Sequence, residues 1–214
     1  MKEKLVIATT NKNKVERIKK LLKKTNFEVV GLSDIVKGKI DEPKETAENG
    51  VDNAIEKAIY YVNYLPEDTV VLSQDDTIEL IGVHEEDEPK GHIKEPVIKK
   101  YGKFTDELAA KYYSELADKY GGTIPIVFKY GHAVAIIETT DRMRKRILSA
   151  ESKLEARLVN KIYKLNECPG YFLAALMEVK IDNEWIPYND LTDDQLIDLD
   201  IDLKRSIISL LKEI

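Results

Sequence analysis

Residues 6–22 read VIATTNKNKVERIKKLL, and this stretch places a β-branched apolar run directly before a polar turn and a lysine-rich segment. The run predicts a buried strand over residues 4–9. After the turn, apolar residues recur at helical spacing and predict a helix through about residue 24. The recurring positions are Val15, Ile18, Leu21 and Leu22. A strand followed directly by a helix is typical of α/β proteins.

The turn between this strand and this helix favours an anionic ligand. A helix start leaves backbone N–H groups without intrahelical partners and carries the positive end of the helix dipole. Thr9, Thr10 and Asn11 add short polar side chains, and Lys14 follows one turn into the helix. The expected ligand is a phosphate chain. A simpler interpretation stays open, in which Thr10 or Asn11 only caps the helix and the lysines are solvated.

Strands and helices continue to alternate along the rest of the chain. Up to residue 76, the pattern predicts a strand over 27–32, a loop over 37–48 and a strongly amphipathic helix over 51–62. It also predicts a buried strand, TVVLS at 69–73, that ends where QDD follows at 74–76. Beyond it, we expect an exposed excursion over 84–103, a helix over 105–120, a hairpin over 123–139 joined near Tyr130 and Gly131, helical structure over 141–166, a strand over 172–181 and one or two helices over 192–213. These elements predict a mixed α/β protein. The length favours a single domain over residues 1–214, with two lobes.

Two adjacent carboxylates stand out at the expected end of a buried strand. Asp75 and Asp76 follow TVVLSQ, at a position where open α/β sheets bind their ligands. Adjacent carboxylates repel each other, and Mg²⁺ relieves that repulsion through oxygen ligation. Glu45, in the preceding loop, could complete a metal site, and Lys57 could face a phosphate. Each of these residues, taken alone, could also be an ordinary solvated surface charge.

The bulk composition limits the classes of partner. With 43% hydrophobic and 34% charged residues, the chain is expected to fold rather than remain disordered. A formal net charge of −6 gives no general basic field for a nucleic acid polymer or an anionic membrane, so any polyanion must be bound locally. No apolar run reaches the roughly 18 residues of a membrane span. The chain has one cysteine, Cys168, which excludes an intrachain disulfide. We therefore expect a cytoplasmic protein.

Three segments of the chain form an ordered set: IATTNKNKVERIKKLL at 7–22, EPKETAENGVDNAIEKA at 42–58 and VVLSQDDT at 70–77. They resemble segments of the Ham1 or inosine triphosphate pyrophosphatase family. In the same order, they are similar to the family's T-x-N-x-x-K turn, its E-T-x5-E-N-A-x-x-K-A segment and its A-D-D-S-G strand end. Glu45 stands seven residues before Asp52, as the family's glutamate stands before its Glu-Asn-Ala. The resemblance covers roughly residues 5–77.

The resemblance implies a two-lobed α/β fold with an elongated mixed sheet flanked by helices, a cleft between the lobes and usually a homodimer. It implies hydrolysis of a nucleoside triphosphate to a monophosphate and pyrophosphate with Mg²⁺ as cofactor. Carried over by position, the substrate-binding residues would be Thr9, Thr10, Asn11, Lys14, Lys57 and Thr77. Glu45 and Asp76 would hold the metal. Asp76 would also orient or deprotonate the attacking water, with Asp75 in support.

The resemblance weakens after Asp76. Thr77 and Ile78 replace the family's serine and glycine, and PGYFLAA at 169–175 replaces F-G-Y-D-P, which helps to seat the base. DLDIDLKRS at 198–206 stands where the family has the S-H-R triplet that reads the purine. Base specificity therefore remains open. Two alternatives also remain: a non-catalytic nucleotide-binding or sensor protein on the same scaffold, and an unrelated α/β nucleotide-utilising enzyme.

The histidines lie too far apart in the sequence to predict a metal site. They are His84, His92 and His132, and all three are expected to be non-catalytic. Tyr60, Tyr61 and Tyr64, near the end of the long amphipathic helix, favour core or dimer contacts over stacking on a base.

Overall fold

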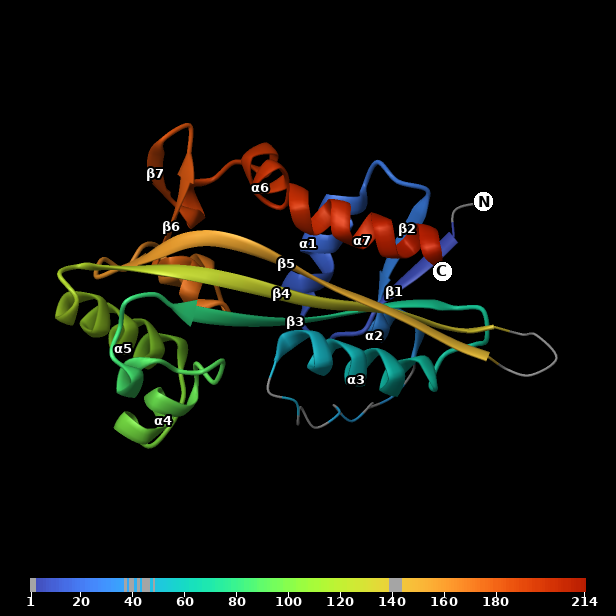
Figure 1. Ribbon diagram of the computed structural model, residues 1–214, viewed down its shortest axis with the longest axis horizontal. Helices are drawn as coiled ribbons and strands as arrows, with labels where there is room; N and C mark the ends of the chain where they lie inside the picture. The colour runs from blue at the N-terminus through green and yellow to red at the C-terminus, as the bar shows by residue number, and fades with distance from the viewer. Residues whose placement is uncertain are drawn as a thin grey trace. The chain divides into compact units, whose positions relative to one another are not determined.

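The computed structural model describes residues 3–36, 38, 41, 43, 47, 49–138 and 144–214, without the side chain of Arg144. Figure 1 shows the chain. The strands are β1 (Glu3–Ile7), β2 (Phe27–Gly31), β3 (Val70–Leu80), β4 (Thr123–Glu138), β5 (Arg144–Val159), β6 (Met177–Ile181) and β7 (Glu184–Pro187). The α-helices are α1 (Lys12–Leu22), α2 (Leu32–Ile35), α3 (Gly50–Val62), α4 (Glu95–Tyr101), α5 (Asp106–Lys119), α6 (Asp193–Leu199) and α7 (Ile201–Glu213). Short 3₁₀ helices are η1 (Glu85–Asp87), η2 (Leu165–Glu167), η3 (Phe172–Ala175) and η4 (Tyr188–Asp190).

The chain forms two compact units, and the longest strands contribute to both. The first unit comprises residues 1–76, 130–152 and 197–214, and the second comprises 77–129 and 153–196. Within the described residues, the hydrogen-bonded strand order is β2-β1-β3-β4-β5-β6-β7. β1 pairs in parallel with β2 and β3, whereas β6 pairs antiparallel with β5 and β7. The predicted mixed α/β class with a mixed sheet is confirmed, while a single domain over 1–214 stays a prediction.

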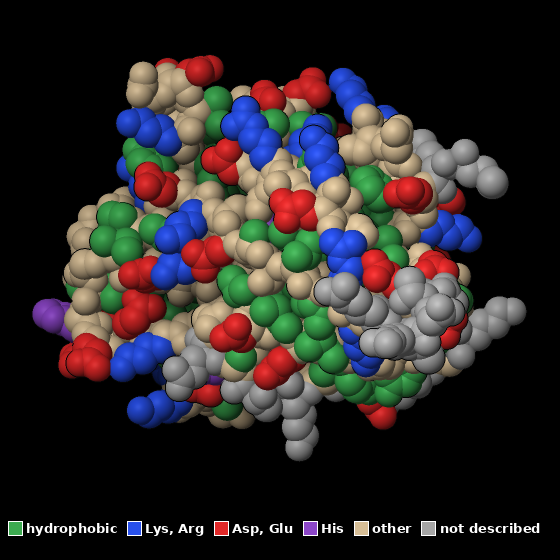
Figure 2. Space-filling view, turned by 45° about the vertical axis from the view of Figure 1, so that its right-hand side comes forward, with side chains coloured by type: hydrophobic (Ala, Val, Ile, Leu, Met, Phe, Trp, Pro, Cys, Tyr) green, Lys and Arg blue, Asp and Glu red, His purple; other side chains and the backbone are tan. Residues whose placement is uncertain are grey.

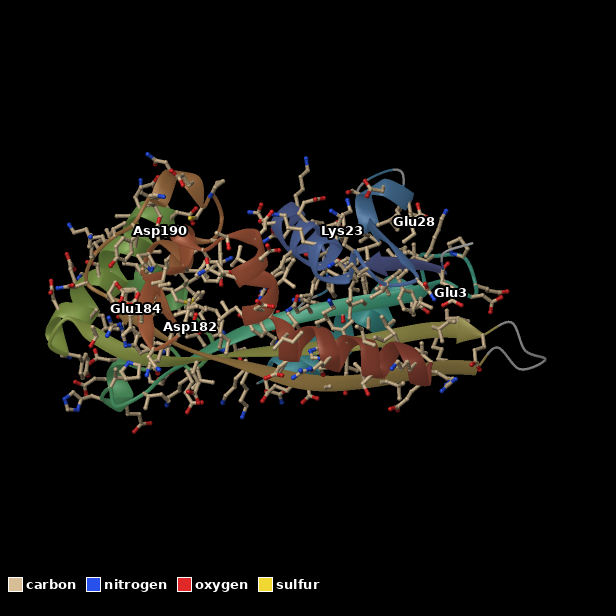
Figure 3. The ribbon with its side chains drawn as sticks, turned by 90° about the horizontal axis from the view of Figure 1, so that it is seen from above. Glu3, Lys23, Glu28, Asp182, Glu184 and Asp190 are labelled. Carbon is tan, nitrogen blue, oxygen red and sulfur yellow. The ribbon has the colours of Figure 1, made fainter. Side chains whose placement is uncertain are left out.

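In the first unit, α1 and α3 lie on opposite faces of the parallel strands. The crossover from β1 through α1 leads to β2 on one side, and the crossover through α3 leads back past β1 to β3. Such crossovers are right-handed, and the two run in opposite directions across the sheet. Their helices therefore lie on opposite faces. Figure 1 shows α7 and α3 on opposite sides of the strands. In Figure 3, Lys23 and Glu28 mark the return from α1 into β2.

The core of the first unit agrees with the predicted patterns. Val15, Ile18, Leu21 and Leu22 are the buried residues of α1, as their spacing predicts. On the other face, the apolar side of α3 packs against β1, β3 and β4. The core residues of this cluster include Val6, Ala54, Ala58, Tyr61, Val62, Val71, Ala133 and Ala135. The predicted helices over 51–62, 105–120 and 192–213 are confirmed as α3, α5 and the pair α6 and α7.

The predicted hairpin over 123–139 is wrong, because β4 runs without a turn through Tyr130 and Gly131. Gly131 serves a different purpose from a turn glycine. A Cβ atom added there would overlap the backbone of Gly50 and Val51 at the start of α3. The missing side chain thus lets a helix terminus approach the strand backbone directly.

The predicted helical structure over 141–166 is also wrong, since residues 144–159 form β5. In its second half the strand alternates buried and exposed residues: Ser152, Leu154, Ala156 and Leu158 are buried, while Lys153 and Glu155 are exposed. This two-residue period belongs to a half-buried strand. The residues are good helix formers, and pairing within the sheet overrides that weak preference. The expected strand over 172–181 is correct only from Met177, because η3 precedes it.

Two further boundaries differ from the expectation. β3 continues to Leu80 instead of ending at residues 74–76. Residues 84–103 contain η1 and α4, and Val97 of α4 is fully buried, so this stretch is only partly an exposed excursion. Most of the predicted loop over 37–48 lies outside the described residues.

On the face shown in Figure 2, basic and acidic side chains are interspersed, without a continuous basic surface. This mixture agrees with the net charge of −6. Within the described part of the chain, no helix combines the length and the apolar character that crossing a bilayer requires.

Candidate functional site

The turn after β1 is organised by side-chain hydrogen bonds to the backbone. Asn11 is the N-cap of α1, and its Oδ1 accepts hydrogen bonds from the backbone N–H groups of Asn13 (2.9 Å) and Lys14 (3.4 Å). The Thr9 hydroxyl oxygen accepts one from the Asn11 N–H at 3.1 Å. The capping interpretation is therefore correct for the Asn11 oxygen. Its side-chain NH₂ group can still donate to a ligand, since an amide has two donors.

Lys14 is not a solvated surface lysine. Its Nζ lies 3.0 Å from Asp76 Oδ2, and the two side chains are 26% and 20% exposed. This half-buried ion pair connects the first turn of α1 to β3. It brings together two of the residues that the sequence predicts for a phosphate and metal site.

Asp75 has a separate set of partners on α3. Lys57 Nζ lies 2.7 Å from Asp75 Oδ1, and the Asn53 amide donates to Asp75 Oδ2 at 3.1 Å. Asn53 Oδ1 in turn accepts a hydrogen bond from the backbone N–H of Ala47. Asn53 and Lys57 are four residues apart, so they share one side of the helix. Asp75 is thus fixed by an ion pair and an amide.

The two aspartates point to opposite faces of the sheet, because they are consecutive residues within β3. Asp75 faces α3 and Asp76 faces α1. The expected repulsion between neighbouring carboxylates at a strand end is therefore wrong, and each aspartate instead has its own lysine.

Both aspartates nevertheless lie beside the carboxyl end of β1. The last β1 residue, Ile7, is paired with Leu72, and β3 extends beyond this point. In the strand order β2-β1-β3-β4, the connection that follows β1 leads to β2 on one side, and the connection that follows β3 leads to β4 on the other side. The two connections therefore separate at the carboxyl ends of β1 and β3. Open α/β sheets bind ligands in this kind of crevice. The site thus occupies the position in the sheet that the fold class favours.

Asp76 Oδ1 is buried and has no hydrogen-bond partner among the described residues. A buried carboxylate oxygen is costly to leave unsatisfied. A hard cation such as Mg²⁺ favours this type of ligand, so Asp76 fits a metal site. Glu45, the second predicted ligand, lies outside the described residues. Within the described ranges, no group of three His, Cys, Asp or Glu side chains could hold a metal ion.

The structure brings most of the predicted residues into the first unit, around the end of β1. These are Thr9, Thr10, Asn11, Lys14, Lys57, Asp75 and Asp76. Thr10 is exposed in the turn, and Thr77 is half-buried on β3 where the second unit begins. The proposed roles of all these residues stay predictions.

The sequence interpretation missed two buried polar residues near the site, Asn53 and Gln74, and named a third, His132, without predicting its burial. The spacing of Asn53 and Lys57 could have indicated that Asn53 faces Asp75. For Gln74 the signal is its place directly after the buried residues 71–73 of β3, because buried polar groups need partners. His132 gives no local signal, since its surroundings come from α7 and from the neighbouring strand β3.

A third ion pair links α1 to the start of α7. Arg17 binds Asp200 through two hydrogen bonds, at 2.6 Å from Nε and 2.5 Å from an NH₂ nitrogen. The Arg17 guanidinium also lies 4.6 Å from the centre of the Tyr130 ring. Bidentate pairs of this kind fix orientation as well as charge. Asp200 belongs to the stretch that replaces the family's S-H-R triplet, and here it positions α1.

His132 predicts a pH dependence of stability. Its Nδ1 lies 3.0 Å from the Tyr130 carbonyl oxygen, which can only accept, so Nδ1 carries a proton and Nε2 accepts from the Ser206 hydroxyl at 2.8 Å. Burial lowers the pKa of His132 below its usual 6.5, against the opposing effects of the Tyr130 carbonyl, Asp76 and Glu151. The unfolded chain therefore binds this proton more readily, and stability is lost as the pH falls from 6.5 through the lowered pKa.

The measurement is urea unfolding of the wild type and of His132→Gln between about pH 8 and pH 5. Because glutamine does not titrate, the wild type should lose stability relative to the variant on acidification. Parallel stability curves over this range would contradict the assignment.

The family model described as Ham1 matches residues 5–112 of the chain. A dITP/XTP pyrophosphatase from Mannheimia succiniciproducens is 43% identical over 60 residues, which is 28% of this chain and 29% of that protein. The match thus spans less than a third of this relative's length.

Solved structures are similar over nearly the whole chain. The Ham1 protein of Staphylococcus aureus has a TM-score of 0.58 at 16% identity, covering 97% of this chain and 98% of its own. A Coxiella burnetii HAM1 protein has a TM-score of 0.58 at 15% identity, covering 97% and 99%. A nucleoside-triphosphatase or dITP/XTP pyrophosphatase from Mycobacterium abscessus has a TM-score of 0.56 at 16% identity, covering 97% and 98%. At these identities, the similarity establishes the fold.

Proposed function

Because the chain belongs to the Ham1 family, we propose that it is a Mg²⁺-dependent nucleoside triphosphate pyrophosphatase. It hydrolyses a noncanonical or altered nucleotide to a nucleoside monophosphate and pyrophosphate. The observation that carries this proposal is the Lys14–Asp76 ion pair beside the end of β1, with Asp76 Oδ1 lacking a partner among the residues that the structure describes. The name of the Mannheimia relative, a dITP/XTP pyrophosphatase, supports the substrate class.

The first step is binding of the triphosphate at the start of α1. Lys14 leaves Asp76 and neutralises phosphate charge, while the side-chain NH₂ of Asn11 and the hydroxyls of Thr9 and Thr10 donate to phosphate oxygens. Thr77 follows on β3 and, by strand alternation, shares the face of Asp75, where its hydroxyl is a further donor. Lys57 contributes positive charge from the other face, where it also holds Asp75.

The second step is attack by water on the phosphorus that becomes the monophosphate. An O–P bond forms, the bridging P–O bond breaks, and pyrophosphate leaves with the electron pair. Asp76 accepts the water's proton, and Asp75 keeps β3 in position through Lys57 and Asn53. Mg²⁺, held by Asp76 and Glu45, would neutralise charge that develops on the phosphate oxygens.

A non-catalytic nucleotide-binding or sensor protein is the second candidate. It is favoured by one observation: in the stretch that replaces the S-H-R triplet, Asp200 is engaged by Arg17. Asp200 is therefore not available to read a base. We also propose that the chain forms a homodimer, which light scattering can test.

The test is a panel of nucleoside triphosphates that includes ITP, dITP and XTP beside the standard nucleotides, each incubated with Mg²⁺. We expect at least one of them to yield monophosphate and pyrophosphate in equal amounts. If none is hydrolysed, the enzyme proposal is wrong. Calorimetric binding without hydrolysis would then support the sensor.

A further inference from the structure

Gln74 is a buried polar residue that the proposed mechanism has not used. Its side chain is only 6% exposed, and its Nε2 has no hydrogen-bond partner within the described part of the chain. An unsatisfied buried N–H group is unfavourable, because it has lost its hydrogen bonds to water. The glutamine also departs from the A-D-D-S-G pattern, where this position is alanine. A group that lowers stability without a structural partner points to a ligand.

Gln74 shares a face of β3 with Asp76. Side chains alternate along a strand, and the intervening Asp75 contacts α3 on the other face. Ser73 agrees with this alternation, because its hydroxyl donates to the Ala54 carbonyl oxygen of α3. The backbones of Gln74 and Asp76 are therefore about 6.5–7 Å apart along the strand. On this face Asp76 contacts Lys14 of α1.

Gln74 Nε2 and Asp76 Oδ1, which both lack partners in the described part of the chain, have opposite hydrogen-bonding character. Gln74 Nε2 can only donate, and an ionised Asp76 Oδ1 can only accept. A phosphate would satisfy the glutamine but be repelled by the aspartate, and a cation would do the reverse. Water both accepts and donates, so a single water molecule has the hydrogen-bonding character that both atoms require.

We propose that Gln74 positions the attacking water of the hydrolysis proposed above, on which this inference rests. The amide N–H donates to one lone pair of the water oxygen, and one water proton points to Asp76 Oδ1. The second lone pair attacks phosphorus. As the O–P bond forms, that proton moves to Asp76, the bridging P–O bond breaks, and pyrophosphate leaves with the electron pair. A carboxylate offers about four lone-pair positions, so Asp76 can hold a cation and accept the proton.

The test is Gln74→Met, which keeps the length of the side chain and removes its N–H groups. We expect kcat to fall by roughly 10²- to 10³-fold, as for the removal of one hydrogen-bond donor from an active site. The Kd of a non-hydrolysable triphosphate with Mg²⁺, measured by calorimetry, should stay unchanged. The melting temperature should rise by a few degrees, because the unsatisfied N–H is removed.

Ser152→Ala is the matched control. The Ser152 hydroxyl is also buried and has no partner among the residues described, but it belongs to β5 and plays no part in the proposed chemistry. This variant should gain stability and keep the wild-type kcat.

Three results would overturn the role of Gln74. An unchanged kcat would exclude water positioning, and a weaker Kd with unchanged kcat would place the amide on the nucleotide instead. A lower melting temperature together with lower kcat would indicate a structural residue. If the wild type hydrolyses no triphosphate, the proposed function itself fails, which separates that outcome from all three.

Discussion

Asp76→Asn should lower kcat by about 10³-fold or more, since a general base typically contributes 10²- to 10⁴-fold and asparagine cannot accept the proton. Asparagine is nearly the same shape, so β3 should keep its pairing with β1. It also releases Lys14 from its ion pair, at 3.0 Å in the wild type. The amine is then available to a phosphate, and nucleotide binding without Mg²⁺ should be no weaker than in the wild type. Steady-state pyrophosphate release and calorimetry in a chelator measure the two effects.

Glu79→Gln is the control for removal of a carboxylate from the same strand. Glu79 pairs with Lys129 at 2.6 Å and is 48% exposed, so its loss should leave both kcat and stability nearly unchanged. Retention of more than a tenth of the wild-type kcat in Asp76→Asn would remove Asp76 from the proton transfer. Loss of binding together with turnover would instead assign Asp76 to positioning of the substrate.

Gly131→Ala should be strongly destabilising, by about 3 kcal/mol or more. The added methyl group would overlap backbone atoms of Gly50 and Val51, which cannot rotate away as a side chain can. Either α3 moves from the strand or β4 bends. Because α3 carries Lys57 and Asn53, Asp75 would lose its partners in the same event. Chemical denaturation of the variant measures the loss.

Gly31→Ala is the matched glycine control. A Cβ there would meet the Asp34 carboxylate at 3.3 Å and a Val15 methyl at 3.6 Å, which are side-chain atoms that can adjust. Its effect should stay within about 1 kcal/mol. If Gly131→Ala were equally mild, the contact between β4 and the start of α3 would not be as close as described.

The sequence predicts the first part of the fold well, because local pattern and environment agree there. Val15, Ile18 and Leu21 have helical spacing and are buried as a helix face. The errors come from residues whose state depends on distant partners. The Tyr130–Gly131 pair resembles a turn, yet its glycine is required by the approach of α3. Residues 144–159 are good helix formers, and their position between β4 and β6 makes them a strand.

The site also has features that local sequence patterns predict and features that depend on distant partners. Lys14, Lys57, Asp75 and Asp76 can be identified from motif spacing, and the structure places each lysine against one aspartate. Which lysine contacts which aspartate depends on β3 continuing past these residues. That continuation follows from pairing with β4, which lies more than forty residues further along the chain. His132 and Gln74 depend on long-range contacts in the same way.

Because Asp75 and Asp76 lie on opposite faces, β3 is sensitive to an insertion that shifts its register. Insertion of one residue between Leu72 and Ser73 would rotate each following side chain to the other face. Each lysine would then meet the wrong partner, although no residue type had changed. Insertion of two residues would restore the faces but displace both carboxylates by about 6.5–7 Å. Among homologous genes, we therefore expect length variation to be excluded from this strand and concentrated in the loops around it.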